Sequence, residues 1–256
     1  MLLSNYMKVV IIRKFIVSIV FLLVSFVSYS QRLYPIFELG GSMGTFIYQG
    51  DLTPSLLGSY RHLSPTVQLY AAVILNKNLT FRGNFTMGNI SGADRWITSS
   101  FWRPERNLSF NTSIHELSGT VAFNNFRYNN DGTFKRLSLY LFVGAGISYL
   151  NINRNWKNIN TSIFTPNTSV GLGLGIDTNH ILPKFIPVIP FGFGLRYALL
   201  GSYLSLACEF TYRKIFSDYL DGFSYAGNPK QNDEYYNYSI GIIYTKYRKI
   251  LKCPKF

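Results

Sequence analysis

Hydrophobic and polar residues alternate strictly through most of the chain after residue 35. In 79–88, for example, Leu79, Phe81 and Phe85 alternate with Thr80 and Arg82. The same repeat occurs in five clear and three weaker segments in all: 79–88, 137–148, 189–198, 204–213 and 236–245, then 36–48, 66–75 and 107–127. Since a strand sends successive side chains to opposite faces, the pattern predicts eight strands, each with one apolar face.

One of the weaker segments, 107–127, contains an irregularity. Its apolar positions change phase between Ile114 and Leu117. A β-bulge adds one residue to a strand and so shifts the alternation by one position. We therefore expect a bulge at this point.

The other set of alternate positions decides between a soluble β-sandwich and a membrane barrel. A sandwich would expose many Lys, Glu and Arg on its wet face, whereas these positions are largely Gly, Ser, Ala, Thr and Asn. Small polar residues inside and apolar residues outside suit a narrow barrel in lipid. We predict an all-β protein, a transmembrane antiparallel up-and-down β-barrel, in which Phe81, Phe85, Phe191 and Phe210 face acyl chains.

Connection lengths orient the predicted barrel. The connections 50–64, 91–106, 151–188 and 216–234 are long, whereas 76–78 and 199–202 are short and 128–136 is moderate. Bacterial barrels place short turns in the periplasm, so both ends of this barrel's chain are expected there.

The segment Thr168–Asp177 complicates the strand count because it also alternates. Ten strands are therefore possible. We prefer eight, with 168–176 in an external hairpin, because one inserted strand would reverse the loop pattern downstream.

The first 30 residues have the features of a secretory signal. Lys8, Arg13 and Lys14 precede the apolar run Phe15–Val27, and small residues follow at 28–30. This pattern predicts a signal peptide at 1–30 and a mature barrel at 31–256 in the bacterial outer membrane. An uncleaved helical anchor is the alternative, but the run is shorter than the roughly 20 residues needed to span a bilayer.

The chain is strongly basic, with 25 Lys plus Arg against 12 Asp plus Glu and a net charge of +13. Basic residues gather near the predicted periplasmic end, above all in and beside a short tail at 248–256: Lys246, Arg248, Lys249, Lys252 and Lys255. Nucleic acid is not an expected partner outside the cytoplasm. Two partners stay open: anionic phospholipid head groups of the membrane, or an acidic surface of a periplasmic protein.

The predicted inward face carries three acids and three bases: Glu38, Glu116 and Glu209, with Arg82, Arg196 and Arg213. Side chains fill the interior of an eight-stranded barrel, and charges persist there when they are paired. The sequence therefore predicts an ion-pair network that plugs the lumen. A catalytic carboxylate or a proton path is the alternative that we favour less.

Candidate chemistry elsewhere is sparse. Ser113 and His115 stand two apart on one predicted strand and could together attack a lipid ester, but no acid lies near them to orient the imidazole. Neither His62 nor His180 has a companion at metal-ligand spacing. We therefore expect no catalytic residue, metal, cofactor or small-molecule substrate.

Short motifs in a fixed order resemble one known family. They are Glu38, Gly40 and Gly41; Tyr48, Gly50, Asp51 and Leu52; Gly92 and Asp94; Arg106 to Phe110; Glu116 and Leu117; Pro190, Gly192, Gly194, Arg196 and Tyr197; Glu209, Tyr212 and Arg213; Asp218 to Asp221; and Cys253 with Pro254. The chain resembles the PorG-type outer-membrane barrels of the type IX secretion system, also called the DUF6089 family. It departs from the family pattern in 151–188 and at Gly222.

The resemblance implies a barrel that anchors periplasmic secretion-machinery proteins and performs no chemistry itself. The basic tail fits such a docking role. A generic small barrel for adhesion or envelope integrity is the alternative, and a lipid-modifying enzyme is less favoured.

Overall fold

A computed structural model describes residues 37–53, 58, 60, 63–76, 78–97, 100–124, 135–200, 203–227 and 233–246. The predicted signal peptide and the tail at 248–256 lie outside these residues. The strands are β1 (Phe37–Gln49), β2 (Ser64–Ile74), β3 (Leu79–Ala93), β4 (Ser109–Phe123), β5 (Leu137–Asn155), β6 (Phe185–Leu200), β7 (Leu204–Ile215) and β8 (Glu234–Lys246). The helices are η1 (Asp94–Trp96), α2 (Trp102–Arg106) and α3 (Ser169–Asn179).

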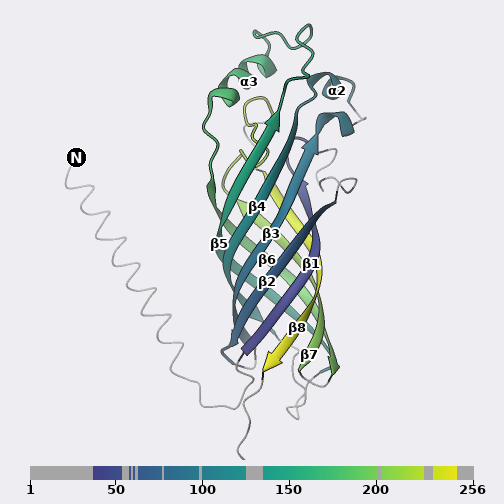
Figure 1. Cartoon of the computed structure of the whole chain (residues 1–256), viewed down its shortest axis with the longest axis vertical. Coiled ribbons are helices and arrows are strands. Elements are labelled where there is room, and N and C mark those ends of the chain that lie inside the picture. The colour runs from purple at the N-terminus through teal and green to yellow at the C-terminus, as the bar shows by residue number, and fades with distance from the viewer. Residues whose placement is uncertain are drawn as a thin grey trace, which may run out of the picture. The chain divides into compact units, whose positions relative to one another are not determined.

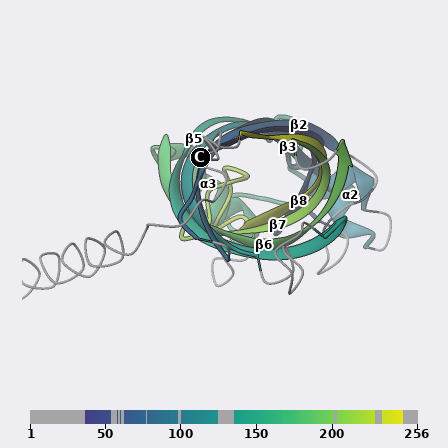
Figure 2. The same ribbon diagram turned by 90° about the horizontal axis from the view of Figure 1, so that it is seen from below.

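The eight strands form one closed barrel, in which each strand pairs antiparallel with its neighbours in sequence (Figure 1). Pairing of β1 with β8, from Phe37 opposite Lys246 to Gln49 opposite Glu234, closes the sheet. The view along the barrel shows the resulting ring (Figure 2). Closure leaves no unpaired strand edge, which a sheet in lipid requires. The predicted fold class and the count of eight strands are confirmed.

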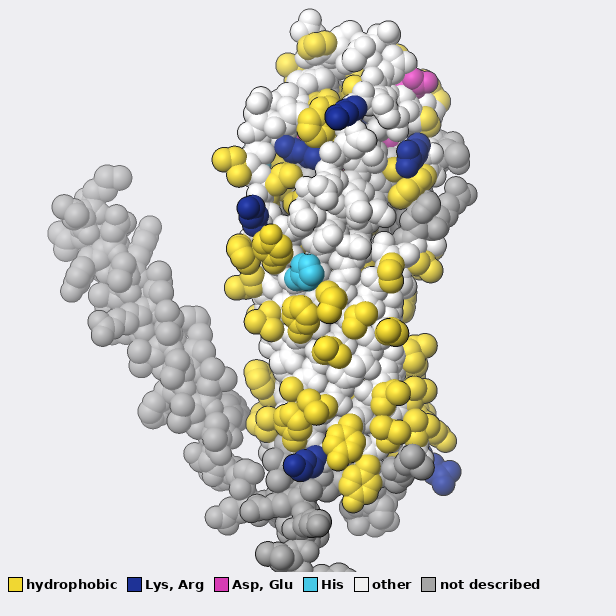
Figure 3. All heavy atoms as spheres, viewed as in Figure 1, with side chains coloured by type: hydrophobic (Ala, Val, Ile, Leu, Met, Phe, Trp, Pro, Cys, Tyr) yellow, Lys and Arg dark blue, Asp and Glu magenta, His cyan; other side chains and the backbone are white. Residues whose placement is uncertain are grey.

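The outer surface of the barrel is apolar, as the alternation predicts. In β3, Phe81 and Phe85 are exposed whereas Arg82 and Asn84 between them are buried. Exposed apolar side chains continue around the barrel, with Phe81 48% and Phe191 43% accessible. Figure 3 shows them gathered over the lower part of one face. Since an exposed apolar area of this extent is unfavourable in water, this belt faces lipid.

No helix within the described ranges is both long and apolar enough to cross a membrane.

The predicted bulge near Ile114 is wrong. Strand β4 pairs with β3 and with β5 without a register shift from Ser109 to Phe123. Phe110, Thr112 and Ile114 are buried on the same inward face as Glu116. The apparent phase change arises because the lumen itself changes from apolar to polar along the strand.

The prediction for 168–176 is also wrong, since this segment is neither an extra strand nor part of a β-hairpin. It begins α3, where the Thr168 side chain caps the helix by accepting a hydrogen bond from the Gly171 N–H (3.2 Å). Gly173 packs directly against the chain at Tyr225: a Cβ atom built there would lie 2.2 Å from the Tyr225 carbonyl oxygen. Glycine at position 173 therefore allows the helix to pack closely against residue 225. The alternation of glycine with larger residues in this segment does not indicate a strand.

The two ends of the barrel differ. Strands β2 and β3 are joined by a tight turn in which the Asn76 side chain accepts hydrogen bonds from the N–H groups of Asn78 (2.9 Å) and Leu79 (2.8 Å). The connections at the opposite end are longer and contain η1, α2 and α3. Short turns are periplasmic in bacterial barrels, so the helical end is external.

Candidate functional site

The six charged residues of the inward face lie within ion-pair distance of one another in three pairs. Arg196 Nη1 lies 2.6 Å from Glu38 Oε1, Arg82 Nη1 lies 2.8 Å from Glu209 Oε1, and Arg213 Nε lies 2.6 Å from Glu116 Oε2. The pairs join β6 to β1, β3 to β7, and β7 to β4. None of these strand pairs is hydrogen-bonded in the sheet, so each ion pair crosses the lumen.

Further donors satisfy each carboxylate. Thr245 donates to Glu38 (3.0 Å), Tyr140 donates to Glu209, and Tyr235 donates to Glu116 (3.1 Å). Aromatic rings also cover the bases: the Arg82 guanidinium lies 4.5 Å from the centroid of the Tyr70 ring. Each buried charge thus has the partners that offset the cost of its burial.

A small cavity lies between these pairs. A cavity of about 10 Å³ lies between Arg82, Glu116 and Arg213. That volume corresponds to about one water molecule. At this level the described side chains therefore occupy much of the lumen, as the predicted ion-pair network requires.

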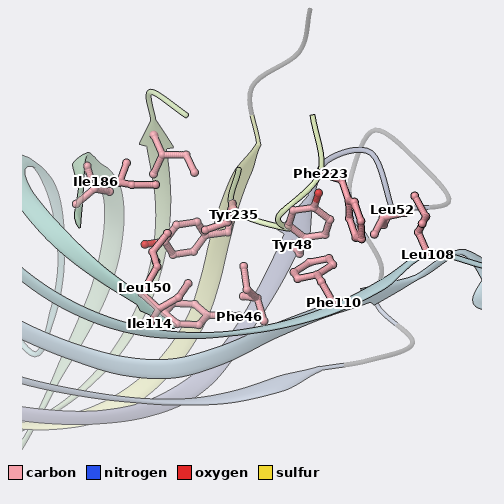
Figure 4. Close-up of a cluster of buried hydrophobic side chains, with 14 of the residues drawn as sticks. Phe46, Tyr48, Leu52, Leu108, Phe110, Ile114, Leu150, Ile186, Phe223 and Tyr235 are labelled. Carbon is pink, nitrogen blue, oxygen red and sulfur yellow. The ribbon is translucent and has the colours of Figure 1, made fainter. Parts of the chain in front are cut away.

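Above the ion pairs the lumen is apolar, a feature that the sequence analysis missed. Figure 4 shows the side chains that converge there from several strands and from the external loops. The cluster comprises Phe46, Tyr48, Leu52, Ile90, Leu108, Phe110, Ile114, Leu150, Ile186, Val188, Ile215, Leu220, Phe223, Ala226 and Tyr235. The Tyr48 and Phe110 rings meet edge to face with centroids 4.8 Å apart.

The upper cluster is closed by residues 216–227, which we call the cap loop. Leu220 and Phe223 are fully buried, at 0% and 1% exposure, so the loop folds into the mouth of the barrel. The Thr112 hydroxyl of β4 donates to the Leu220 carbonyl (2.8 Å). Gly222 has φ +84°, a conformation that glycine adopts without strain. The external end is therefore sealed by a packed loop.

Polar groups from two other loops hold the cap loop. Asp177 of α3 accepts hydrogen bonds from three successive cap-loop N–H groups, those of Ser224 (3.1 Å), Tyr225 (3.1 Å) and Ala226 (2.8 Å). Arg106 of α2 donates to the Ala226 carbonyl (2.8 Å).

Arg106 is itself fixed by a carboxylate. Its Nε and Nη2 atoms lie 2.7 and 2.8 Å from the two oxygens of Asp94, a bidentate pair that is fully buried. The same carboxylate accepts the Leu108 N–H (3.1 Å). The cap is thus a cooperative arrangement of three external connections.

Two buried carboxyl groups meet inside this cap. The Tyr48 hydroxyl lies 2.8 Å from Asp221 Oδ2 and 2.6 Å from Asp233 Oδ1. Burial, and the charge of Asp233 beside it, hold the pKa of Asp221 well above its usual range, and burial raises the pKa of Asp233 in the same way. Burial also raises the pKa of the neighbouring Asp218 to about 6. Burial thus favours the protonated form of both carboxyl groups, which share a single hydroxyl donor.

The periplasmic end carries the described part of the predicted docking residues. Lys246 is exposed at the end of β8, and Arg136 is exposed and Lys135 half-buried beside the start of β5. The other predicted docking residues, Arg248, Lys249, Lys252 and Lys255, lie outside the described residues. Within the described part of this end, the acid Glu38 is buried and no acid is exposed.

Ser113 and His115 lie on the outward face of β4, as expected. His115 stands opposite Tyr149 of β5, with ring centroids 6.3 Å apart. On the outward faces of β3, β4 and β5 there is no Asp or Glu, so no acid orients the imidazole. Over the described ranges of the chain, no group of three or more His, Cys, Asp or Glu side chains is arranged to hold a metal ion.

The family comparison covers nearly the whole of this arrangement. Residues 13–251 match the model described as "Domain of unknown function (DUF6089)". The chain belongs to the DUF6089 family. In this DUF6089 barrel, motif residues such as Tyr48, Asp94, Arg106 and Asp221 take part in the external cap. Because the barrel is closed and has an apolar exterior, we describe this DUF6089 protein as a bacterial outer-membrane barrel.

Several solved structures are similar to this chain at low sequence identity. The attachment invasion locus protein Ail of Yersinia pestis, in complex with the heparin analogue sucrose octasulfate, is 13% identical, with 82% of this chain and 99% of that chain covered and a TM-score of 0.42. OprG from Pseudomonas aeruginosa is 8% identical, with 85% and 98% covered and a TM-score of 0.48. Neisserial surface protein A is 9% identical, with 81% and 96% covered and a TM-score of 0.44. No curated protein matches the DUF6089 chain.

Proposed function

We propose that this DUF6089 barrel is a non-enzymatic component of a protein secretion apparatus of the type IX kind, where it anchors a periplasmic partner protein to the outer membrane. The charge at its periplasmic end carries the proposal. Arg136 and Lys246 are exposed there. The sequence then continues into the basic segment 248–256.

The filled lumen supports a role at the barrel's ends. Three buried ion pairs and the apolar cluster above them occupy the interior. A lumen occupied in this way directs attention to the surfaces of the barrel. A basic periplasmic surface attracts a partner with an acidic surface, and this attraction weakens as salt screens the charges.

Deletion of 248–256, combined with Lys246→Glu, tests the anchor in a strain that requires the protein for secretion. We expect the periplasmic partner to be lost from the purified barrel and secretion to fall, while the amount of folded barrel in the outer membrane stays unchanged. The matched control replaces Lys246, Lys249, Lys252 and Lys255 by Arg, which retains every charge. Normal secretion and partner recovery in the deletion strain would contradict the proposal.

The same experiment separates a protein partner from anionic phospholipid. If the basic residues serve only the lipid surface, the deletion weakens binding of phosphatidylglycerol-containing vesicles but leaves the recovered protein partners unchanged. That result would remove the anchor function and retain only the lipid role.

The proposal that the barrel is not an enzyme can be tested at Ser113. Because no acid orients His115, Ser113 has no activated base beside it. We expect Ser113→Ala to leave the lipid A profile unchanged by mass spectrometry. A changed profile would favour a lipid-modifying barrel.

A second candidate function is adhesion or envelope integrity through the external loops. The packed cap loop favours it, since Asp177 and Arg106 hold that loop in one conformation. In that case, deletion of the cap loop would impair the cell surface phenotype and deletion of 248–256 would not.

A further inference from the structure

The outer surface of the barrel changes character on one side, just above the apolar belt. Six outward positions at the external ends of β3, β4 and β5 carry amides and hydroxyls, and we call them the polar face: Asn89, Ser91, Ser109, Asn111, Asn153 and Asn155. Figure 3 shows a largely uncoloured area above the yellow side chains on the side where these strands lie in front. None of the six residues is charged.

Strand register brings these side chains into a regular array. Asn111 stands opposite Ser91 of β3 and opposite Asn153 of β5, and Ser109 stands opposite Asn155. Side chains directly opposite on one face of a sheet have Cβ atoms roughly 4.5–5.5 Å apart. The polar face thus presents several donors and acceptors close together on one surface.

The array also forms a concave surface. A groove of about 440 Å³ is lined by all six residues, with Arg95 and Trp96 of η1 at its edge. Arg95 is exposed, and its guanidinium lies 5.9 Å from the centroid of the Trp96 ring. An arginine at the edge of an otherwise uncharged groove suits a sugar that bears a phosphate or carboxylate.

The chemistry of the groove selects its ligand class. Each Asn amide offers two donors and an acceptor oxygen, and each Ser hydroxyl donates and accepts. Saccharide hydroxyls need this mixture. A phospholipid head group or a strongly acidic protein would instead be matched by several Lys or Arg side chains, and the six residues of the polar face include none.

The position of the groove identifies the source of the saccharide. On β4 the outward residues continue from the polar face through Ser113 and His115 to Leu117, which is 67% exposed in the apolar belt. The polar face is therefore continuous with the lipid-facing surface at its external edge. In an outer membrane, the layer directly above the outer-leaflet acyl chains is the sugar of lipopolysaccharide.

We propose that the polar face binds the core oligosaccharide of outer-leaflet lipopolysaccharide. The amides and hydroxyls of β3–β5 bond the sugar hydroxyls, and Arg95 binds an acidic substituent. This site lies at the opposite end of the barrel from Lys246 at the end of β8, so it is independent of the anchor function.

The test uses the full-length barrel, refolded in detergent micelles, and core oligosaccharide freed from lipid A by mild acid hydrolysis of the host's lipopolysaccharide. Binding is measured by calorimetry and by saturation-transfer NMR. The variant Asn111→Ala/Asn153→Ala removes two central amides. The matched control, Asn158→Ala/Asn167→Ala, removes two exposed amides from the connection before α3.

We expect at least a tenfold weaker affinity in the Asn111/Asn153 variant and an unchanged affinity in the control. If the variant does not refold, as judged by its heat-modifiable migration on a gel, the single variant Ser91→Ala gives the readout, with an expected threefold loss. Failure of the wild-type barrel to bind the oligosaccharide, equal losses in variant and control, or binding that 0.5 M salt abolishes completely would each overturn the proposal, the last because it would indicate charge attraction alone.

Discussion

The guanidinium of Arg213 lies 2.6 Å from the carboxylate of Glu116, with each side chain only 1% exposed. Asn237 accepts a second hydrogen bond from Arg213 (2.6 Å). The two charged residues belong to β7 and β4, which are not neighbours in the sheet. The pair therefore connects distant walls of the barrel, and each charge is stable in the lumen because its partner is present.

Glu116→Gln should lower the free energy of unfolding by about 3–5 kcal/mol, because it leaves the Arg213 charge buried without its counter-ion. Urea unfolding of the barrel in lipid vesicles measures this change. Lys214→Gln is the control, since Lys214 pairs with Glu234 on the exposed side and should contribute about 0–1 kcal/mol. Equal effects of the two substitutions would contradict a structural role for the lumen pair.

The filled lumen predicts the absence of a large, stable conductance in planar bilayers. The apolar cluster and the ion pairs block the interior at successive levels. Removal of the cap loop alone should therefore leave the barrel closed, since the ion pairs remain below it. Large stable channels in the wild-type protein would show that the lumen is open.

The closed barrel could be predicted from sequence patterns because side chains that face lipid must be apolar. Phe81 and Phe191 face lipid irrespective of what their inward neighbours do, so their alternation persists. Inward side chains, by contrast, are apolar at some levels of the lumen and charged at others. Ile114 and Glu116 both point into the lumen, but the surroundings of Ile114 are apolar and those of Glu116 are polar. In the sequence, this change from an apolar to a charged inward residue has the same pattern as a bulge.

The cap could not be predicted from local patterns, because it is made by contacts between distant segments. Asp177 and Ala226 meet across 49 positions of sequence. The alternating glycines of 171–175 have the pattern of a strand, yet Gly173 is required by a close approach to Tyr225. One available signal was the density of Asp and Tyr in 218–221, which is unusual for an exposed loop and fits a buried hydrogen-bonded site.

Substitution of Gly173 should detach α3 from the cap loop. A Cβ at this position would lie 2.2 Å from the Tyr225 carbonyl oxygen, so Gly173→Ala forces the helix away. Hydrogen exchange should become faster at the N–H groups of Ser224 and Ala226, which Asp177 holds. Gly175→Ala is the control, because a Cβ there meets nothing within 4 Å, and it should stabilise α3 by up to about 1 kcal/mol. Unchanged exchange in Gly173→Ala would contradict the packing argument.

The cap should open as pH rises. In the closed cap, burial raises the pKa of Asp218 to about 6 and holds the pKa values of Asp221 and Asp233 well above their usual range. The unfolded pKa of Asp is about 3.9, so the closed cap binds more protons than the open one. Closure is therefore most favourable below about pH 4, weakens as pH rises through about 6, and weakens further when Asp221 and Asp233 ionise.

Protection factors of the Leu220 and Phe223 amides, measured by hydrogen exchange between pH 5 and pH 9, should fall with rising pH in the wild type. In Asp221→Asn the protection should fall less with rising pH than in the wild type, because the amide keeps an acceptor for the Phe223 N–H and carries no charge beside Asp233, while Asp218 still ionises. Asp177→Asn supplies the contrast: it places an amide against three N–H donors and should loosen the loop at every pH. Equal pH dependence in the wild type and in Asp221→Asn would show that another group controls the cap.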